Sequence, residues 1–351
     1  MSLNLRSHSV NCYAYSKLLY KCNIVDPRSE DLQVFTSAAK SFVYIGLLCK
    51  PSETVLFRKT EDGGLGLLHI QCRAKAALLS TFLQTAINPN FHRNNFHNVL
   101  YRKYVHNENI EAPRIPQSMA GDFFPTLREL YTAFGELETL DLKTVYGFLV
   151  ADIIRVREDP DSPLIGEERD LIPLACEVAR PSNNWPEAWR RARLKGLGPE
   201  LTSFLLKMMW GILPTRERLH KIMPKLYLTN ACPLCNQAGG DQREDTGHAL
   251  MDCEANQGTP SDLMALLRTY QPAITTRQVL ALEIEVDPVM ELPLIWITAT
   301  SLSTIWSQRQ EGLISRAKTR AELKAKCKFL EQSIDLNALM MTSLALDKMF
   351  T

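Results

Sequence analysis

Apolar residues recur three and four positions apart along most of this 351-residue chain, and this spacing is the strongest constraint on its fold. Within residues 26–46 the spacing is carried by Leu32, Phe35, Phe42 and Ile45. Side chains at these intervals share one face of an α-helix, so the segment predicts an amphipathic helix. The same spacing predicts helices at about 9–24, 68–87, 94–106, 125–135, 141–157, 199–210, 262–270, 292–310 and 313–330. Alternating, strand-like patterns are short and few, so we expect a mostly α protein, an extended assembly of many helices.

Two polar, proline-rich stretches, around residues 107–125 and 157–170, interrupt the helical pattern. They lack the apolar residues that a core needs, so we interpret them as linkers or surface loops. The sequence then predicts a helical segment at 1–50, a helical connector at 51–160, a helical region ending in a cysteine-rich module at 171–260, and a C-terminal helical region at 261–351.

The composition is that of an ordinary soluble globular protein, with 45% hydrophobic and 23% charged residues. A net charge of +1 provides no overall attraction to nucleic acid or membrane, so any such binding must rest on local clusters. Apolar runs such as 42–49 and 292–299 are much shorter than the roughly 20 residues that span a bilayer, and we predict no transmembrane helix. The polar N-terminus and the irregular spacing of nine cysteines predict an intracellular, reducing location, in the nucleus or cytoplasm.

Three cysteines and one histidine lie within the 22 residues CPLCNQAGGDQREDTGHALMDC, at positions 232–253. Zinc prefers four thiolate or imidazole ligands in a tetrahedron, and Cys232 and Cys235 have the spacing of a tight turn that supplies two of them. His248 and Cys253 form the second pair. Five positions on a continuous α-helix turn about 500°, so these two side chains would diverge by about 140°. We therefore expect the helix to end or bend sharply before Cys253, and we predict a structural Zn²⁺ ion.

A redox-active cysteine pair is the alternative interpretation of Cys232 and Cys235. A redox-active pair is typically preceded by a strand and followed by a helix that begins at the first cysteine. Here the following NQAGGDQ sequence is a poor helix former. Four protein ligands would also close the coordination sphere of a zinc ion. We therefore predict that the metal has a structural role and no catalytic one.

Four short motifs occur along the chain in a recognisable order. They are Ser16-Lys17-Leu18-Leu19-Tyr20, Gly63-Gly64-Leu65-Gly66-Leu67, Leu213-Pro214-Thr215, and the set Cys232, Cys235, His248 and Cys253. This order, over most of residues 9–253, resembles the region from the thumb to the zinc knuckle of LINE-type non-LTR retrotransposon reverse transcriptases. The resemblance implies a thumb-like helical segment at 1–50, a zinc knuckle at 232–253, and element RNA or target DNA as the partner. The chain departs from the family in the longer AGGDQRED segment between Cys235 and His248.

Polymerase chemistry needs adjacent carboxylates for two metal ions, and the sequence contains no Asp-Asp pair. Pro160-Asp161 could begin a nuclease motif, but the partners that it would need, Glu322 and Lys324, lie far downstream. The resemblance therefore implies a fragment of an RNA-directed DNA polymerase polyprotein that is not itself an enzyme.

Basic residues near aromatic ones are candidates for nucleic-acid contact, because cations bind phosphate and rings stack on bases. The first cluster lies beside Trp185 and Trp189 and contains Arg190, Arg191, Arg193 and Lys195. The second precedes the zinc cysteines and contains Arg216, Arg218, His220, Lys221 and Lys225. A weaker candidate is the late stripe Arg316, Arg320, Lys324 and Lys328. The alternative for every cluster is an ordinary solvated face. The glycines at 63–66 lack the Gly-Lys-Ser/Thr of a phosphate loop, so a turn before a helix is the better interpretation.

The first hypothesis from the sequence is a non-catalytic, nucleic-acid-binding C-terminal fragment of a retroelement reverse transcriptase. Two alternatives stay open: a domesticated protein-interaction scaffold with a structural zinc site, and a non-functional retroelement remnant. The choice between RNA and DNA, any protein partner, the oligomeric state and the role of the 236–247 loop are open at this level.

Overall fold

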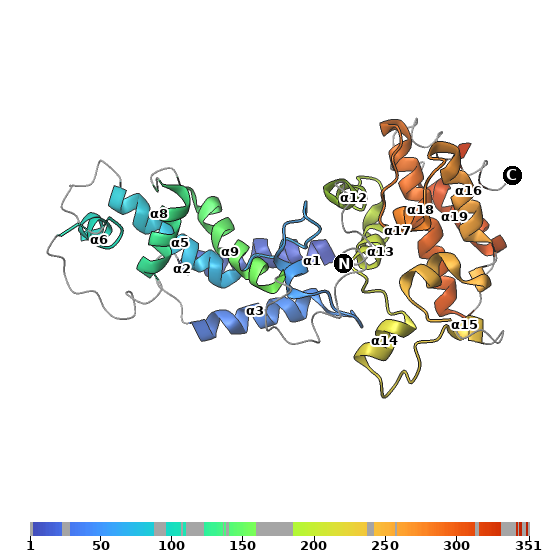
Figure 1. The fold of residues 1–351 in the computed structure, drawn as a ribbon, viewed down its shortest axis with the longest axis horizontal. Coiled ribbons are helices and arrows are strands. Elements are labelled where there is room, and N and C mark those ends of the chain that lie inside the picture. Colours follow the sequence, from blue (N-terminus) through green and yellow to red (C-terminus); the bar gives the residue numbers. More distant parts are fainter. Residues whose placement is uncertain are drawn as a thin grey trace.

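In a computed structural model, the protein is an elongated assembly of helices (Figure 1). The structure describes residues 3–22, 29–87, 96–106, 108–109, 123–135, 137, 140–158, 185–236, 242–256, 258–312, 316–330, 342, 344–345 and 349. The polar stretches predicted as linkers lie largely outside these residues, as does Pro160-Asp161. Within the described residues the fold is mostly helical, as the periodicity predicted, and one isolated antiparallel bridge joins Ala231 to Arg243.

The helices of the first half are α1 (Leu3–Ser9), the π-helical turn η1 (Val10–Tyr15), α2 (Ser16–Cys22), α3 (Ser29–Val43), α4 (Glu53–Phe57), α5 (Ile70–Ile87), α6 (Phe96–Tyr104), α8 (Phe123–Phe134) and α9 (Leu142–Glu158). Those of the second half are α12 (Trp185–Arg191), α13 (Gly198–Met209), α14 (Arg216–Ile222), α15 (Pro233–Asn236), η2 (His248–Asp252), η3 (Glu254–Asn256), α16 (Thr259–Tyr270), α17 (Thr276–Leu280), α18 (Pro288–Gln310) and α19 (Arg316–Leu330).

Every helix predicted from apolar spacing has a counterpart in this set, with ends displaced by a few residues. The short helices α1, α4, α12, α14, α15 and α17 were not predicted, because seven residues or fewer make under two turns and show no period. Local chemistry marks two of them. The Thr215 hydroxyl caps α14, and Thr275 forms a capping box with Gln278 at α17.

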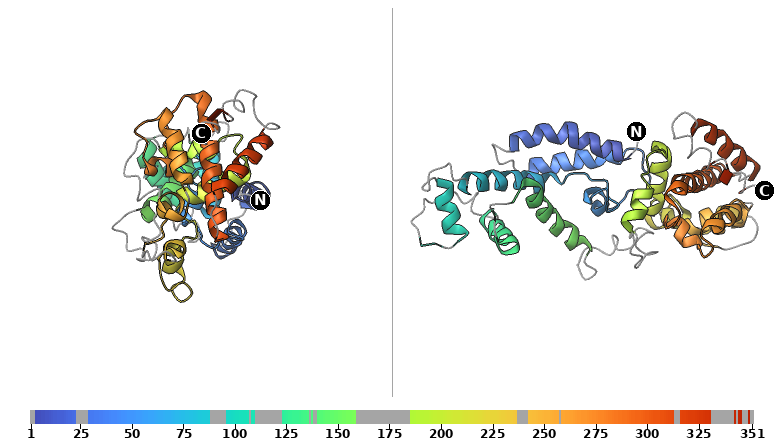
Figure 2. Two further views of the ribbon diagram at one scale, coloured as in Figure 1. Left: turned by 90° about the vertical axis from the view of Figure 1, so that its right-hand side faces the viewer. Right: turned by 90° about the horizontal axis from the view of Figure 1, so that it is seen from above.

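Buried apolar side chains form two large cores. The main core joins both ends of the described chain, from Leu3 in α1 to Met349, and includes Leu56 in α4 and Leu294 in α18. The second core lies between α5, α6, α8 and α9 and includes Leu79 and Leu127. Helix α5 contributes Ile70 to the first core and Leu79 to the second, so it connects them (Figure 2). The four regions expected from composition stay a prediction.

Among the described residues, helix α18 has the length and the apolar composition that could cross a membrane. However, 72% of its most apolar window is buried inside the fold. Its buried face also includes hydroxyl side chains such as Thr298, Ser301 and Thr304. Burial of this kind is typical of a central core helix.

The GGLGL segment at residues 63–67 joins several helices by its backbone. Its N–H groups donate to the chain just before it, including Leu65 N–H to Val55 O at 2.8 Å and Leu67 N–H to Leu56 O at 2.8 Å. No phosphate cradle is formed here, since these donors are used within the fold. The segment leads directly into α5, as expected for a turn before a helix.

The carbonyl groups of the same segment accept side-chain hydrogen bonds from three distant helical regions. Trp210 Nε1 donates to Gly63 O at 2.8 Å, and an Arg193 Nη donates to Gly64 O at 2.8 Å. Ser7 from α1 donates to Leu65 O, also at 2.8 Å. The glycines are required for this close packing, because a Cβ on Gly63 would lie 2.2 Å from the Trp189 ring. The segment therefore joins the N-terminal helices to α12 and α13.

Candidate metal centre

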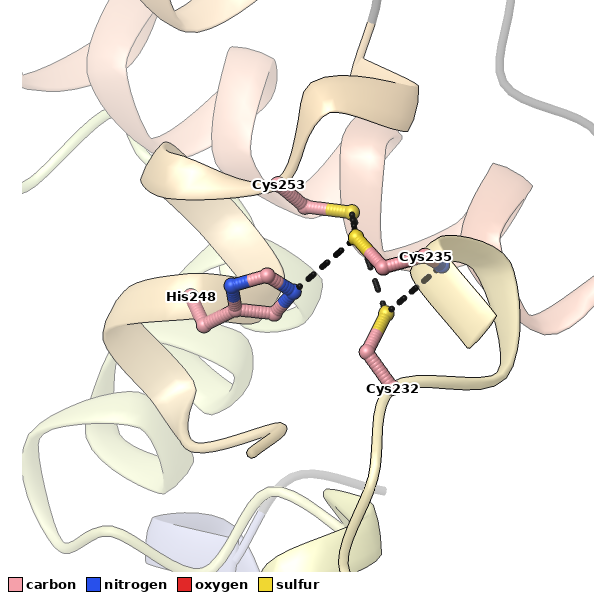
Figure 3. Close-up of side chains that lie close together, drawn as sticks. All are labelled: Cys232, Cys235, His248 and Cys253. Atoms are coloured by element: carbon pink, nitrogen blue, oxygen red, sulfur yellow. Dashed lines mark hydrogen bonds between the residues drawn. The ribbon is translucent and has the colours of Figure 1, made fainter. Parts of the chain in front are cut away.

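The structure brings together the four side chains that the sequence predicted as ligands (Figure 3). Cys232 precedes α15, Cys235 lies within it, His248 begins η2, and Cys253 follows η2 directly. One ligand atom from each residue lies within 4.8 Å of all the others, and all four residues are buried. This Cys₃His cluster could hold a metal ion such as zinc.

Three separations between the ligand atoms are close to those around a tetrahedral ion. Sγ of Cys253 lies 3.8 Å from Sγ of Cys232 and 3.4 Å from Sγ of Cys235, which is itself 3.5 Å from Nε2 of His248. A zinc ion about 2.3 Å from sulfur and about 2.0 Å from nitrogen separates its ligand atoms by about 3.5 to 3.8 Å. A disulfide would need about 2.05 Å, and the three cysteines are free. The donor set and its dimensions therefore suit zinc.

Two backbone features place the ligands. The turn at the first pair is closed by the backbone N–H of Cys235, which donates to Sγ of Cys232 at 3.4 Å. The segments that carry the two ligand pairs are joined by backbone hydrogen bonds next to the isolated bridge between Ala231 and Arg243. Cys232 N–H donates to Gln242 O at 2.7 Å, and Glu244 N–H donates to Asn230 O at 2.8 Å. Segments on either side of the 237–241 interval are thereby held together.

The second pair meets because the helix around it is wound as a π-turn. Cys253 N–H donates to His248 O at 2.9 Å, five residues back, instead of the four of an α-helix. This wider turn places Cys253 above His248, and the chain then becomes extended at Cys253, with φ −73° and ψ 124°. Asp245 fixes the start of the turn by accepting a hydrogen bond from His248 N–H at 2.7 Å. The helix thus ends before Cys253, as the divergence of the two side chains required.

The electrostatics of the cluster suit a cation. Burial, and then the positive charge of Arg309, lower the pKa of His248, which favours the neutral imidazole that can act as a ligand. Burial, and then the neighbouring thiols of Cys253 and Cys232, raise the pKa of Cys235 to about 12. A metal ion would therefore displace a proton from Cys235 on binding.

Two further residues contact the cluster and were not predicted from the sequence. Arg309, near the end of α18, donates from Nη2 to Sγ of Cys232 at 2.8 Å and from Nε to Oε1 of Glu244 at 3.2 Å. Both side chains are buried, at 4% and 6% exposure. No local sequence pattern marks this contact, because Arg309 and Cys232 are 77 positions apart.

Most of the first predicted nucleic-acid cluster makes contacts within the protein. Arg191 is buried, bonds Glu291 of α18 at 3.0 Å and donates to Leu282 O at 3.1 Å. Arg190 pairs with Glu291 as well. Arg193 holds the carbonyl of Gly64, and burial lowers its pKa to about 10. Lys195 is exposed. The side chain of Trp185 lies outside the described part.

The second cluster is more accessible. Arg218 is used internally, since it donates to Gly211 O at 2.8 Å and to Lys50 O at 3.3 Å. Lys221 is exposed and lies 3.4 Å from Glu217, and Lys225 is exposed. Arg216 is half-buried, with its guanidinium 5.1 Å from the centre of the Tyr227 ring.

These residues lie on a projection that we call the arm, residues 216–230, which comprises α14 and the loop after it. The arm stands out from the helical body (Figures 1 and 2). In the loop after α14, Leu226 and Leu228 are 75% and 79% exposed, a feature that the sequence did not predict. The loop is held to α14 by His220, whose Nδ1 lies 2.6 Å from Tyr227 O. The arm therefore presents cations and two unpacked leucines to solvent.

In the late stripe, α19 is helical as predicted and Lys324 is exposed. The side chains of Arg316, Arg320 and Lys328 lie outside the described part.

Comparison with known proteins adds no assignment. No protein-family model matches this chain, and no curated protein matches it.

Proposed function

We propose that Cys232, Cys235, His248 and Cys253 bind one structural Zn²⁺ ion. The convergence of three thiols and one imidazole at tetrahedral spacing is the observation that carries the proposal. With four protein ligands the ion has no open position for water or substrate, so it supplies folding free energy.

The site lies at the base of the arm and supports its position. The arm runs directly into Cys232, and its N-terminal end is tied to the second half of the cluster by Glu217 N–H, which donates to Glu244 O at 3.2 Å. Glu217 also pairs with Arg243 through its carboxylate. Bound zinc would hold the segments before and after residues 237–241 together and so reduce the freedom of the arm.

A rigid, projecting arm with this chemistry suits nucleic acid. Arg216, Lys221 and Lys225 supply positive charge where phosphates can approach, and Leu226 and Leu228 supply apolar contacts for bases or sugars. The resemblance to LINE-type reverse transcriptases supports the same partner, and the absence of an Asp-Asp pair supports a fragment without polymerase chemistry. The function that the site supports best is therefore non-catalytic binding of RNA or DNA by a zinc-stabilised retroelement fragment.

The test replaces Arg216, Lys221 and Lys225 by glutamine together and keeps Arg218, which holds the fold. A matched control replaces three exposed lysines of other regions by glutamine: Lys17, Lys59 and Lys143. Binding of labelled single-stranded RNA and duplex DNA is measured by fluorescence anisotropy at several salt concentrations. Each phosphate contact contributes about 0.7 to 0.9 to the slope of log K against log salt, so the loss of three contacts should reduce the slope by about 2 to 3 units.

The control variant should show the same slope of log K against log salt as the parent. Circular dichroism should show equal thermal stability for the arm variant and the control variant. Equal affinity and slope in the arm variant and the parent would remove the arm as the binding surface. A parent that binds neither nucleic acid at low salt would overturn the proposed function.

A protein-interaction scaffold is the second candidate, favoured by apolar side chains exposed on and after α3. Val34, Phe35, Ile45 and Leu48 are 69%, 45%, 59% and 56% exposed. An apolar surface of this kind is typical of contacts with another protein. Absence of nucleic-acid binding by a folded, zinc-loaded parent would support this alternative.

A further inference from the structure

Arg309 occupies an unusual position, because its guanidinium lies between a predicted metal ligand and a buried carboxylate. Its Nη2 is 2.8 Å from Sγ of Cys232, and its Nε is 3.2 Å from Oε1 of Glu244. The second terminal nitrogen, Nη1, and the other oxygen of Glu244 are buried and have no hydrogen-bond partner among the described residues. A buried ion pair that leaves two polar atoms unpaired is a poor contributor to stability by itself. Another role must account for this arrangement.

The formal charges of the cluster indicate that role. One Zn²⁺ ion with three thiolates and a neutral imidazole carries a net charge of −1. Buried charge needs a partner, and the described residues place one guanidinium, that of Arg309, on the cluster. With neutral thiols instead, Glu244 would be the one anionic contact that the described part of the chain provides for Arg309. Its position is therefore best matched to a metal-loaded cluster.

The bond also connects the cluster to the core of the protein. Arg309 belongs to α18, whose buried side chains, such as Leu294 and Ile305, fill the main core. Cys232 belongs to the segment that follows the arm. An N–H donor on a metal-bound thiolate takes up part of the charge on sulfur and occupies one side of the atom, where a proton would otherwise attack.

We propose that Arg309 is an outer-shell partner of the metal centre, which donates a hydrogen bond to the metal-bound sulfur of Cys232, covers that sulfur and slows release of the metal. This inference rests on the proposed zinc site and adds to it a residue that controls how long the ion stays bound. Glu244 orients Arg309 for this role by holding Nε. Arg309 acts through Cys232 and is a positioning residue.

The test replaces Arg309 by methionine, which fills similar space without charge, and by lysine, which keeps the charge but has no planar fork. The matched control is Arg191→Met. Arg191 is also a buried arginine paired with a carboxylate of α18, at 3.0 Å from Glu291, and no described contact joins it to the cluster. Each full-length protein is loaded with Co²⁺, and two quantities are measured: the thiolate-to-cobalt charge-transfer band and the rate of metal transfer to excess chelator.

We expect Arg309→Met to shift the charge-transfer band and to accelerate metal release at least about tenfold, from the loss of a charge-assisted hydrogen bond. Arg309→Lys should lie between this variant and the parent. Arg191→Met should lower the melting temperature and leave the band and the release rate unchanged. This contrast separates outer-shell control from a loss of stability.

Release at the parent's rate with an unshifted band, in either folded Arg309 variant, would overturn the role of Arg309 while the zinc site stands. If the methionine variant fails to fold, the lysine variant decides by the same two measurements. A parent that binds neither Co²⁺ nor Zn²⁺ would refute the zinc site itself, which is a different outcome.

Discussion

Substitution of Gly64 by alanine tests the arrangement of the GGLGL segment directly. A Cβ built on Gly64 would lie 1.9 Å from the carbonyl oxygen of Arg58 and 2.3 Å from its carbonyl carbon. Both are backbone atoms, and the Arg58 carbonyl is held by Gly66 N–H at 3.0 Å. The clash cannot be relieved by a side-chain rotation, so the loop must move by more than an ångström.

The expected cost follows from what that movement breaks. Overpacking in a well-packed region costs about 1–3 kcal/mol, and each buried hydrogen bond that is lost adds about 1 kcal/mol. The bonds at risk are Gly66 N–H to Arg58 O and Arg193 to Gly64 O. We therefore expect Gly64→Ala to lower the free energy of unfolding by about 3–5 kcal/mol, a large part of the about 5–15 kcal/mol of a typical domain.

The assay is urea denaturation followed by circular dichroism, with the free energy taken from the midpoint at constant m-value. Gly147→Ala is the matched control, because Gly147 lies in α9 and nothing is within 4 Å of its built Cβ. Alanine in an exposed helix should leave stability unchanged or raise it by up to about 1 kcal/mol. A Gly64→Ala protein within about 1 kcal/mol of the parent would refute the packing described for this segment.

Three further predictions concern the metal centre, the core and the arm. Cys232→Ser should abolish stoichiometric zinc binding, measured by atomic emission. It should also remove the stabilisation of about 4 kcal/mol that zinc provides when free zinc is a thousandfold above Kd. The control Cys12→Ser, at an exposed cysteine, should retain both the zinc and the stabilisation. Trp210→Phe should lower the free energy of urea unfolding by about 2–3 kcal/mol, because it leaves space in the core and removes the indole N–H that donates to Gly63 O. An unchanged urea midpoint would contradict this prediction. Burial raises the pKa of Glu217, but the charges and hydrogen bonds of Arg243 and Lys221 together outweigh burial, so the pKa is lowered. The stabilisation from ionised Glu217 is therefore present above the unfolded-state pKa of about 4.3 and is lost as pH falls through the folded-state pKa. The difference in melting temperature between the parent and Glu217→Gln should therefore shrink from pH 7 to pH 3.

The helices and the four side chains of the Cys/His cluster were predictable because both depend on local spacing. An apolar face repeats within a few residues, so α3, α5 and α18 could be placed before any tertiary contact was known. The pairs Cys232/Cys235 and His248/Cys253 are likewise separated by at most five positions. Geometry on one helix even required the chain to change course before Cys253, which the π-turn achieves.

The roles of the basic residues were not predictable in the same way. Arg191 and Lys195 lie four positions apart in one basic run, yet the first is buried against Glu291 and the second is exposed. Sequence density alone reports that cations are present. Their accessibility depends on which helix packs over them, and the partner here lies 100 positions away.

The sequence by itself determined a mostly helical chain and the four residues of a cluster that could hold a metal ion, because helix formation and ligand spacing are short-range properties. Only the tertiary structure decided that the carbonyls of GGLGL join distant helices, that the arm projects with exposed leucines, and that Arg309 lies on Cys232. Each of these contacts joins residues far apart along the chain or depends on the burial of a whole face. Their free energies arise only when the cores form, so no local pattern records them.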